Sequence, residues 1–228
     1  MSPKHPWETV DRMTTPEGRV LSLHHHDGHY FIHLDGEELM STWVHGSETA
    51  LAELAAEALP PGESPRILIG GLGLGFTLRA ALDVFPKQAE IVVAELFPRV
   101  VEWNRNHLTH LGRPLDDSRA RIHDGDVFGL LERQDPIRFD AILLDVDNGP
   151  SEWCMETNSR LYDRRGLELA KASLVPGGIL GVWSAYPDPK FVKILNKSGF
   201  QARAQTVKGR GRKGPRHTIF LARKRGKG

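Results

Sequence analysis

The sequence predicts an α/β fold, a doubly wound and mostly parallel sheet of seven strands preceded by a small antiparallel β meander. Between Arg66 and Gly199, short apolar runs alternate with segments of helical periodicity, as in parallel β-α units. Before them, two Asp-Gly pairs separate runs of period two, and after them two strand-like runs follow each other without a helix. We therefore expect one reversed strand in the large sheet and two parts, residues 1–46 and 47–228.

Composition indicates a globular protein of ordinary polarity. Of the 228 residues, 39% are hydrophobic and 26% are charged. No apolar run approaches the roughly 18 residues of a membrane span, and no secretory pattern opens the chain, so we expect a cytoplasmic protein without membrane contact. The single cysteine, Cys154, excludes an internal disulfide and a Cys-x-x-Cys zinc pair.

The net charge of +1 hides a cationic end on an acidic body. Residues 208–228 carry nine basic and no acidic side chains, which leaves 21 basic against 29 acidic residues in the rest. This end offers a possible but not favoured nucleic-acid contact, because it has no aromatic residue for base stacking in its expected loop. The residues in question are Lys208, Arg210, Arg212, Lys213 and Arg216.

The amino-terminal region is expected to begin with an irregular arm, Met1 to Thr15, that contains two prolines and is followed by a third. Three strand-like runs follow, with Asp27-Gly28 and Asp35-Gly36 as tight turns between them. Histidines on or beside the first hairpin share strand faces and invite a metal reading, but no cysteine or acidic partner completes a site, so we expect no metal. These histidines are His24, His25, His26, His29 and His33.

A helix capped by Ser47 and ended by Pro60-Pro61-Gly62 links the two parts. Core strands are then expected at Ile67–Ile69, Glu90–Glu95, Arg119–His123, Phe139–Asp145 and Ile179–Trp183. Helices are expected at Phe76–Phe85, from Pro98 to about Leu111, from Val127, after a cap at Asp163 and after Asp188-Pro189. The closing hairpin pairs Phe200–Val207 with His217–Arg223 across a basic loop, Lys208–Arg216.

A glycine turn, Gly71-x-Gly73-x-Gly75, follows the first core strand and is the centre of the expected site. Glu95 ends the second strand, where its carboxylate can accept hydrogen bonds from ribose hydroxyls. Asp126 and Asp145 follow the third and fourth strands, so the three acids converge at the carboxyl edge of the sheet. The alternative for each acid is a helix cap or a solvated loop position.

Six motifs follow one another along the chain, namely I-L-I-G-G-L-G-L-G, E-L-F-P-R-V-V-E, G-D-V-F, L-L-D-V-D-N-G-P, L-Y-D-R-R-G-L-E and L-V-P-G-G-I-L. They resemble the spermidine synthase family, whose members have the class I S-adenosylmethionine-dependent methyltransferase fold, a Rossmann-like fold. The amino-terminal meander also looks like the small β-domain of polyamine synthases, so the resemblance spans about Arg19 to Arg223.

The resemblance implies a role for each matched position. Gly71, Gly73 and Gly75 would pass close to the methionine portion of the cofactor, and Glu95 would bind its ribose. Asp126 with Val127 would bind the adenine, and Asp145 would face the reacting centre. Polyamine synthases commonly dimerise, which implies a homodimer here.

The chain also departs from the polyamine synthase pattern. The second acid of the D-S-S-D-P type motif comes early, at Asp147, and Leu74 replaces an aspartate that holds the aminopropyl amine. The expected Asp-Glu and Tyr-His-Glu residues are replaced by T-W-V-H-G-S-E at Thr42–Glu48. We therefore expect S-adenosylmethionine as cofactor and methyl transfer to a small or amine-bearing substrate. Aminopropyl transfer from decarboxylated S-adenosylmethionine is the first alternative, and a non-catalytic nucleoside- or RNA-binding module is the second.

For methyl transfer, the protein must orient a nucleophile and accept its proton. Asp145 or Asp147 is the expected base, with His45 as an alternative that titrates near neutral pH. Trp43, Trp153 and Tyr162 are candidates for the substrate wall, although aromatic residues of this kind are more often part of the core.

Overall fold

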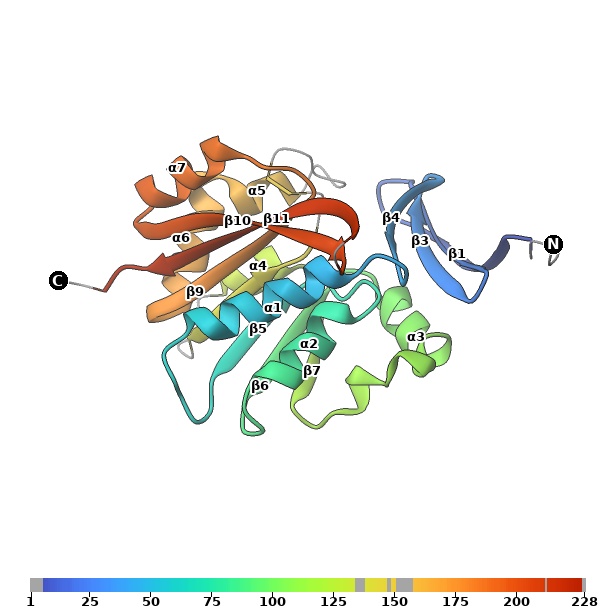
Figure 1. Cartoon of the computed structure of the whole chain (residues 1–228), viewed down its shortest axis with the longest axis horizontal. Coiled ribbons are helices and arrows are strands. Elements are labelled where there is room, and N and C mark those ends of the chain that lie inside the picture. Colours follow the sequence, from blue (N-terminus) through green and yellow to red (C-terminus); the bar gives the residue numbers. More distant parts are fainter. Residues whose placement is uncertain (1–5, 134–137, 147–148, 151–157, 212, 227–228) are drawn as a thin grey trace.

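The computed structural model of the chain describes residues 6–133, 138–146, 149–150, 158–211 and 213–226. It contains two sheets, a four-stranded antiparallel sheet near the amino terminus and a seven-stranded sheet in the larger part (Figure 1). The predicted α/β class, with its amino-terminal meander, is confirmed.

The large sheet has the strand order β10-β11-β9-β8-β5-β6-β7. β11 runs antiparallel to both β9 and β10, and the other neighbours pair in parallel. The chain passes from β5 to β6 on one side and later reaches β8 on the other side, so the topological switch point lies between β5 and β8. The strands are β5 (Arg66–Gly70), β6 (Glu90–Glu95), β7 (Ala120–Asp124), β8 (Phe139–Leu144), β9 (Leu174–Ser184), β10 (Phe200–Arg210) and β11 (Lys213–Lys224).

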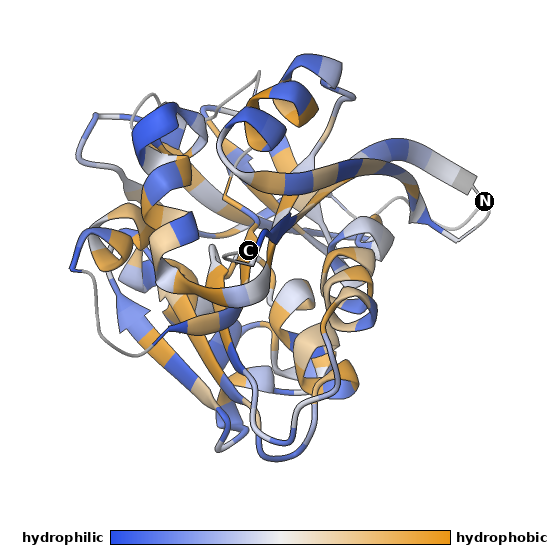
Figure 2. Cartoon of the chain, turned by 90° about the vertical axis from the view of Figure 1, so that its left-hand side faces the viewer, coloured by the Kyte–Doolittle hydropathy of each residue, from blue (hydrophilic) through white to orange (hydrophobic). Residues whose placement is uncertain are grey.

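Helices cover both faces of this sheet, and alternate strand residues point to opposite faces. Ile67 and Ile69 of β5 pack in a core with α1, α2 and α3, whereas Leu68 packs in a second core with α4 to α7. Hydrophobic residues concentrate in the central strands and along parts of the helices around them (Figure 2). The helices are α1 (Gly46–Ala58), α2 (Phe76–Val84), α3 (Pro98–Asn106), α4 (Val127–Glu132), α5 (Ser159–Tyr162), α6 (Arg164–Ser173) and α7 (Pro189–Lys197), with 3-10 turns at Thr109–Leu111 and Pro114–Asp116.

The predicted helix starts at Phe76, Pro98 and Val127 and after Asp163 and Asp188 are correct, whereas the predicted cap at Ser47 is wrong. Asp163 and Asp188 cap α6 and α7 by accepting hydrogen bonds from backbone N–H groups. Ser47 does not cap α1. His45 precedes that helix without a side-chain cap, and the Ser47 hydroxyl turns to Glu48 and His217 instead.

The amino-terminal sheet consists of β1 (Glu8–Thr14), β2 (Val20–His26), β3 (His29–Leu34) and β4 (Glu37–Ser41). Both predicted Asp-Gly turns are confirmed, because the Asp and the Gly of each pair have positive φ, as a type I′ turn requires. The irregular arm expected up to Thr15 is wrong from Glu8 onward. This segment pairs with β2 on both sides of an irregularity between Thr9 and Asp11, with Val10 and Met13 packed toward the core.

The basic loop expected at Lys208–Arg216 is also mostly strand. β10 and β11 remain paired as far as Arg210 and Lys213, across a bulge between Lys208 and Arg210. Over the part of the chain that the structure describes, no helix is long and apolar enough to cross a bilayer.

Candidate active site

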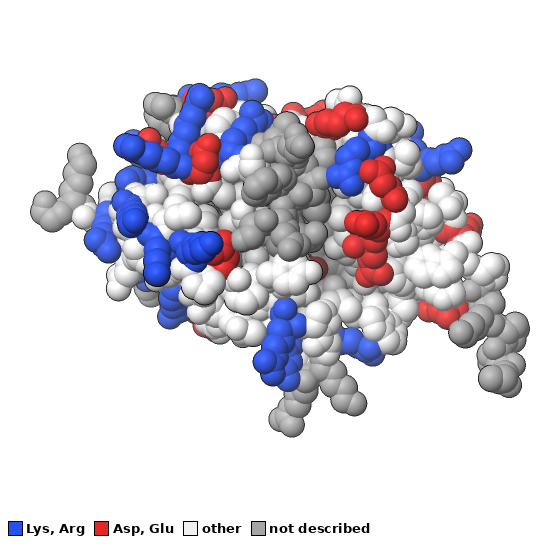
Figure 3. All heavy atoms as spheres, turned by 90° about the horizontal axis from the view of Figure 1, so that it is seen from above, with Lys and Arg blue, Asp and Glu red and all other residues white. Residues whose placement is uncertain are grey.

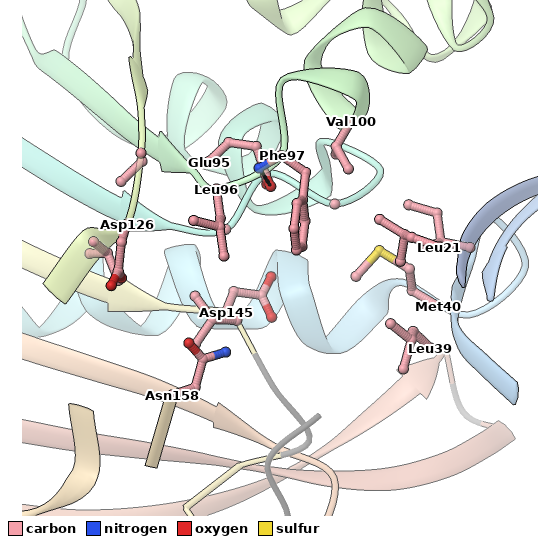
Figure 4. A pocket seen from close by; sticks show the side chains of 17 residues that line it. Leu21, Leu39, Met40, Glu95, Leu96, Phe97, Val100, Asp126, Asp145 and Asn158 are labelled. Atoms are coloured by element: carbon pink, nitrogen blue, oxygen red, sulfur yellow. Dashed lines mark hydrogen bonds between the residues drawn. The ribbon is translucent and has the colours of Figure 1, made fainter. Parts of the chain in front are cut away.

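A pocket lies between the carboxyl edge of the large sheet and the meander. Asp126 lies at one end of it, residues of the meander lie at the other end, and Asp145 lies between them (Figure 4). The strand ends beside the switch point thus form one wall, as is usual for ligand sites of open α/β sheets. The lining residues are Leu21, Ile32, Leu39, Met40, Gly71, Gly73, Ala94, Glu95, Leu96, Phe97, Val100, Gly125, Asp126, Val127, Asp145, Val146 and Asn158.

The glycine turn is shaped by contacts that exclude side chains. Gly71, Gly73 and Gly75 have φ of 88°, 51° and 83°, in the region that favours glycine. A Cβ on Gly71 would lie 2.4 Å from the Asp145 carbonyl oxygen, and one on Gly73 would lie 2.6 Å from the Met40 sulfur. Gly71 and Gly73 line the pocket as predicted, whereas Gly75 precedes α2 against Asn104 and is not among the lining residues.

Asn104 of α3 holds this turn from behind. Its buried side-chain amide donates hydrogen bonds to the carbonyl oxygens of Gly73 (2.8 Å) and Val100 (2.9 Å). Because one buried side chain bonds both to the turn and to its own helix, Asn104 couples the position of the turn to α3.

Glu95 is buried at the end of β6 and lines the pocket. Its two carboxylate oxygens accept hydrogen bonds from the backbone N–H of Leu72 (2.8 Å) and of Phe97 (2.9 Å). Burial raises the pKa of the Glu95 carboxyl, and these hydrogen bonds oppose the rise. These backbone hydrogen bonds hold the Glu95 carboxylate in a fixed position at the pocket wall.

Asp126 caps α4 and also lines the pocket. Its carboxylate accepts the Phe128 N–H (2.9 Å) and pairs with the Arg160 guanidinium. The helix-cap alternative is therefore part of its role, while the neighbouring Val127 packs against Gly70 and lines the pocket beside it.

Asp145 follows β8 and accepts a hydrogen bond from the Thr77 hydroxyl of α2 (2.6 Å). Burial raises the pKa of Asp145 to about 6, although the Thr77 hydrogen bond favours the ionised form. Burial, together with the nearby charge of Asp145, raises the pKa of Glu48 to about 7. The two carboxyl groups therefore titrate as a coupled pair near neutral pH.

The described residues that were predicted to contact the substrate do not line the pocket. Tyr162 is buried in the core, edge-on to Phe191 at 6.0 Å between ring centroids. His45 stacks on Phe76 at 4.1 Å, and Trp43 is covered by the Arg210 guanidinium at 3.6 Å. None of Tyr162, His45 and Trp43 is among the described residues that line the pocket. Asp147 and Trp153 lie outside the described residues.

The wall at the meander end of the pocket consists of aliphatic residues that were not predicted as site residues. Leu21, Ile32, Leu39 and Met40 point into the pocket from β2, β3 and β4. The period-two pattern of the meander indicates an apolar strand face but does not distinguish packing from ligand contact, and the consecutive Leu39 and Met40 do not follow that pattern. Leu74, in contrast, is buried in the core and is not a described lining residue.

The basic carboxyl-terminal residues do not form an isolated cationic loop. Arg210 of β10 stacks on Trp43, which joins the hairpin to the end of the meander. On the face that Figure 3 presents, basic side chains lie beside acidic ones. The nucleic-acid contact stays a disfavoured prediction.

The chain is similar in sequence to a curated spermidine synthase. No family model matches the chain. A spermidine synthase of Dictyostelium discoideum is 31% identical over 117 residues, which are 50% of this chain and 38% of that protein. The chain thus corresponds to well under half the length of this curated relative.

Solved structures are similar in fold to this chain over most of its length. A spermidine synthase in complex with the transition-state analogue AdoDATO has a TM-score of 0.73 at 18% identity, covering 95% of this chain and 72% of that one. The spermidine synthase of Thermotoga maritima has a TM-score of 0.73 at 17% identity with the same coverage. A probable spermidine synthase of Corynebacterium glutamicum ATCC 13032 has a TM-score of 0.65 at 18% identity, covering 95% and 79%.

These comparisons overturn the expectation of a methyltransferase, because the sequence relative and these structural neighbours are named as spermidine synthases. The expectation gave too much weight to Leu74, which does not line the described pocket. In sequence over half of its length and in fold over almost all of it, the chain is spermidine synthase-like.

Proposed function

We propose that this chain is a transferase that moves an aminopropyl group from decarboxylated S-adenosylmethionine to a small amine acceptor. The observation that carries the proposal is Asp145, a carboxylate at the switch point that lies between a nucleoside-type end and an apolar end of one pocket. The similarity to spermidine synthases supports the same reaction.

The residues of the pocket fit this cofactor chemically. Glu95 offers fixed acceptor oxygens for ribose hydroxyls, and Asp126 with Val127 offers a polar and an apolar contact for an adenine. Three carboxyl groups in one pocket also suit a ligand with positive charges, and Gly71 and Gly73 let the backbone approach it closely. When bound, this cofactor supplies a carbon made electrophilic by a positively charged sulfur.

Asp145 would accept the proton that the acceptor amine must lose. The acceptor nitrogen forms a bond to the electrophilic carbon as the carbon–sulfur bond breaks, and the electron pair remains on sulfur. A carboxylate with a pKa of about 6 is a stronger base than an ordinary aspartate and is still mostly ionised at pH 7. The methylene chain of the acceptor would lie against Leu39 and Met40 at the meander end.

The test is release of methylthioadenosine from decarboxylated S-adenosylmethionine in the presence of diamines of increasing length. We expect turnover with at least one diamine and a loss of roughly 10²–10⁴-fold in Asp145→Asn, the usual range for a general base. Asp163→Asn, which changes a helix cap outside the pocket, is the control and should retain turnover. Absence of methylthioadenosine with every diamine would refute the proposal.

The homodimer, implied by the resemblance, and the cytoplasmic location, expected from the sequence, stay predictions. Light scattering of the purified protein tests the first of them.

A further inference from the structure

The end of the pocket that the meander forms is lined by aliphatic side chains from three strands. These residues, called the meander wall below, are Leu21 of β2, Ile32 of β3, and Leu39 and Met40 of β4. Figure 4 shows Leu21, Leu39 and Met40 on the side of the pocket opposite Asp126. Leu21 and Ile32 are buried, whereas Leu39 and Met40 are half-buried. The meander thus presents one apolar surface to a ligand in this pocket.

The meander wall is held in place by packing. Leu21 and Ile32 belong to the hydrophobic core. A Cβ on Gly73 would lie 2.6 Å from the Met40 sulfur and 2.7 Å from the terminal methyl carbon of Met40. The Met40 side chain therefore fills the space beside the glycine turn, and Val100 of α3 is a further apolar lining residue. A ligand meets an apolar surface that exists before it binds.

The acids of the meander are paired elsewhere or exposed. The Asp11 carboxylate accepts a hydrogen bond from the Trp103 indole N–H (2.8 Å) and lies 3.5 Å from the Arg99 guanidinium. Asp35 pairs with Arg19 at 2.7 Å. None of the meander acids is among the described residues that line the pocket. Those that are exposed are Glu8, Glu17, Asp27, Glu37 and Glu38.

Charge and apolar surface therefore lie in different parts of the pocket. The described acids that line it, Glu95, Asp126 and Asp145, each end or follow a strand of the large sheet. An alkylamine stays charged at pH 7, because its pKa is about 10. A second ammonium at the meander wall would lose water without gaining a carboxylate partner among the described residues, which is unfavourable. A methylene buried there instead favours binding by about fourfold.

We propose that the preferred acceptor is a primary amine with one charged end and an apolar tail, and that the meander wall binds this tail. The proposal rests on the aminopropyl transfer proposed above and names the class of its acceptor. Asp145 takes one proton from the acceptor ammonium, and the nitrogen then bonds to the electrophilic carbon as the carbon–sulfur bond breaks. The electron pair stays on sulfur, and the products are methylthioadenosine and a secondary ammonium that carries the tail. Diamines are acceptors of lower efficiency.

The first test compares two amines of equal size. Pentylamine and diaminobutane, which has an amine at each end, have the same number of non-hydrogen atoms, and a methyl group in the first replaces an ammonium in the second. Methylthioadenosine release by the full-length protein gives kcat/KM for each with decarboxylated S-adenosylmethionine. We expect pentylamine to exceed diaminobutane by about tenfold or more, with a rise of about fourfold per methylene from propylamine to pentylamine. Equal efficiency, or a preference for diaminobutane, would overturn the inference.

The second test places a charge at the meander wall. Leu39 is half-buried, so a polar side chain can be accommodated there. Leu39→Glu supplies a carboxylate, and Leu39→Gln supplies a side chain of the same shape without the charge. The efficiency ratio of diaminobutane to pentylamine should rise about tenfold or more in Leu39→Glu and much less in Leu39→Gln. Val20→Glu adds a charge at an exposed position of β2 and should leave the ratio unchanged.

Equal ratios in Leu39→Glu and Leu39→Gln would overturn the assignment of the tail to the meander wall. Calorimetry of the wild-type protein loaded with methylthioadenosine measures the preference without turnover, and pentylamine should bind more tightly than diaminobutane. Tighter binding of pentylamine without methylthioadenosine release from any amine would refute the proposed function alone. Efficient release with diaminobutane, not exceeded by pentylamine, would overturn this inference and leave aminopropyl transfer intact.

Discussion

Replacing Gly71 by alanine tests how closely the glycine turn is fitted to the end of β8. The new methyl group would lie 2.4 Å from the Asp145 carbonyl oxygen and 3.1 Å from its carbon, in a backbone with φ of 88°. Backbone atoms at a strand end cannot swing aside as a flexible side chain can. The turn and the Asp145 peptide must therefore separate, and the base moves with them.

The expected loss of unfolding free energy in Gly71→Ala has two parts, one from the backbone conformation and one from steric contact. A left-handed conformation costs a non-glycine residue about 1–2 kcal/mol, and forced overpacking in a closed site adds roughly 1–3 kcal/mol. Gly177→Ala is the matched control, because its φ is 79° with open space around the added methyl. We expect Gly177→Ala to lose about 1–2 kcal/mol of unfolding free energy and Gly71→Ala about 2–5 kcal/mol.

Urea unfolding of both variants, followed by circular dichroism, measures these losses of stability. Calorimetry measures how tightly each variant binds decarboxylated S-adenosylmethionine. We expect binding to weaken in Gly71→Ala and to be unchanged in Gly177→Ala. Equal losses of stability in the two variants, with equal ligand affinity, would refute the claim that the turn is held against Asp145.

Three further predictions follow from the contacts of the site. Asp145→Asn should lower the pKa of Glu48 below about 7, because a neighbouring like charge is removed; an unchanged Glu48 titration in carboxyl ¹³C NMR would contradict the coupling. Asn104→Ala should cost about 1–3 kcal/mol of stability and also weaken cofactor binding, since the Gly73 carbonyl loses its donor. The control is Asn196→Ala, which loses a comparable bond to Val192 in α7 and should lower stability without changing cofactor binding. The raised pKa values of Asp145 and Glu48 mean that the folded state binds more protons than the unfolded state between about pH 4 and 7. Their contribution to stability therefore falls as pH rises through this range, and Glu48→Gln should flatten the slope in urea unfolding at pH 5, 6 and 7.

The fold was predictable because its signals are local. Asp27-Gly28 and Asp35-Gly36 specify turns by chemistry that only a few residues can satisfy, and Asp163 and Asp188 bear carboxylates suited to helix caps. The strand Glu8–Thr14 was missed since its partner, β2, follows later in the sequence, and the prolines flank this strand without interrupting it.

The candidate site was predictable to the extent that it follows the strand ends. Gly71, Glu95, Asp126 and Asp145 meet at one edge because each follows or ends a parallel strand of the same sheet. Contacts between distant segments left no such signal. A serine and a histidine 170 positions apart show no pattern in sequence, and the Ser47 hydroxyl resembled an ordinary helix cap.

The weight given to Leu74 illustrates the same limit. The sequence shows that an acid is replaced by a leucine, but not that this side chain turns into the core while Asp145 faces the pocket. The leucine at position 74 therefore argued against aminopropyl transfer, although the Asp145 carboxylate still lies in the pocket.

The central claim is tested most directly by a competition between the two possible cofactors. The protein is incubated with equal concentrations of S-adenosylmethionine and its decarboxylated form, together with the diamine that serves best as acceptor. Mass spectrometry of the nucleoside products then identifies the bond that breaks. Aminopropyl transfer predicts methylthioadenosine and an acceptor enlarged by one aminopropyl group, whereas S-adenosylhomocysteine and a methylated acceptor would contradict it.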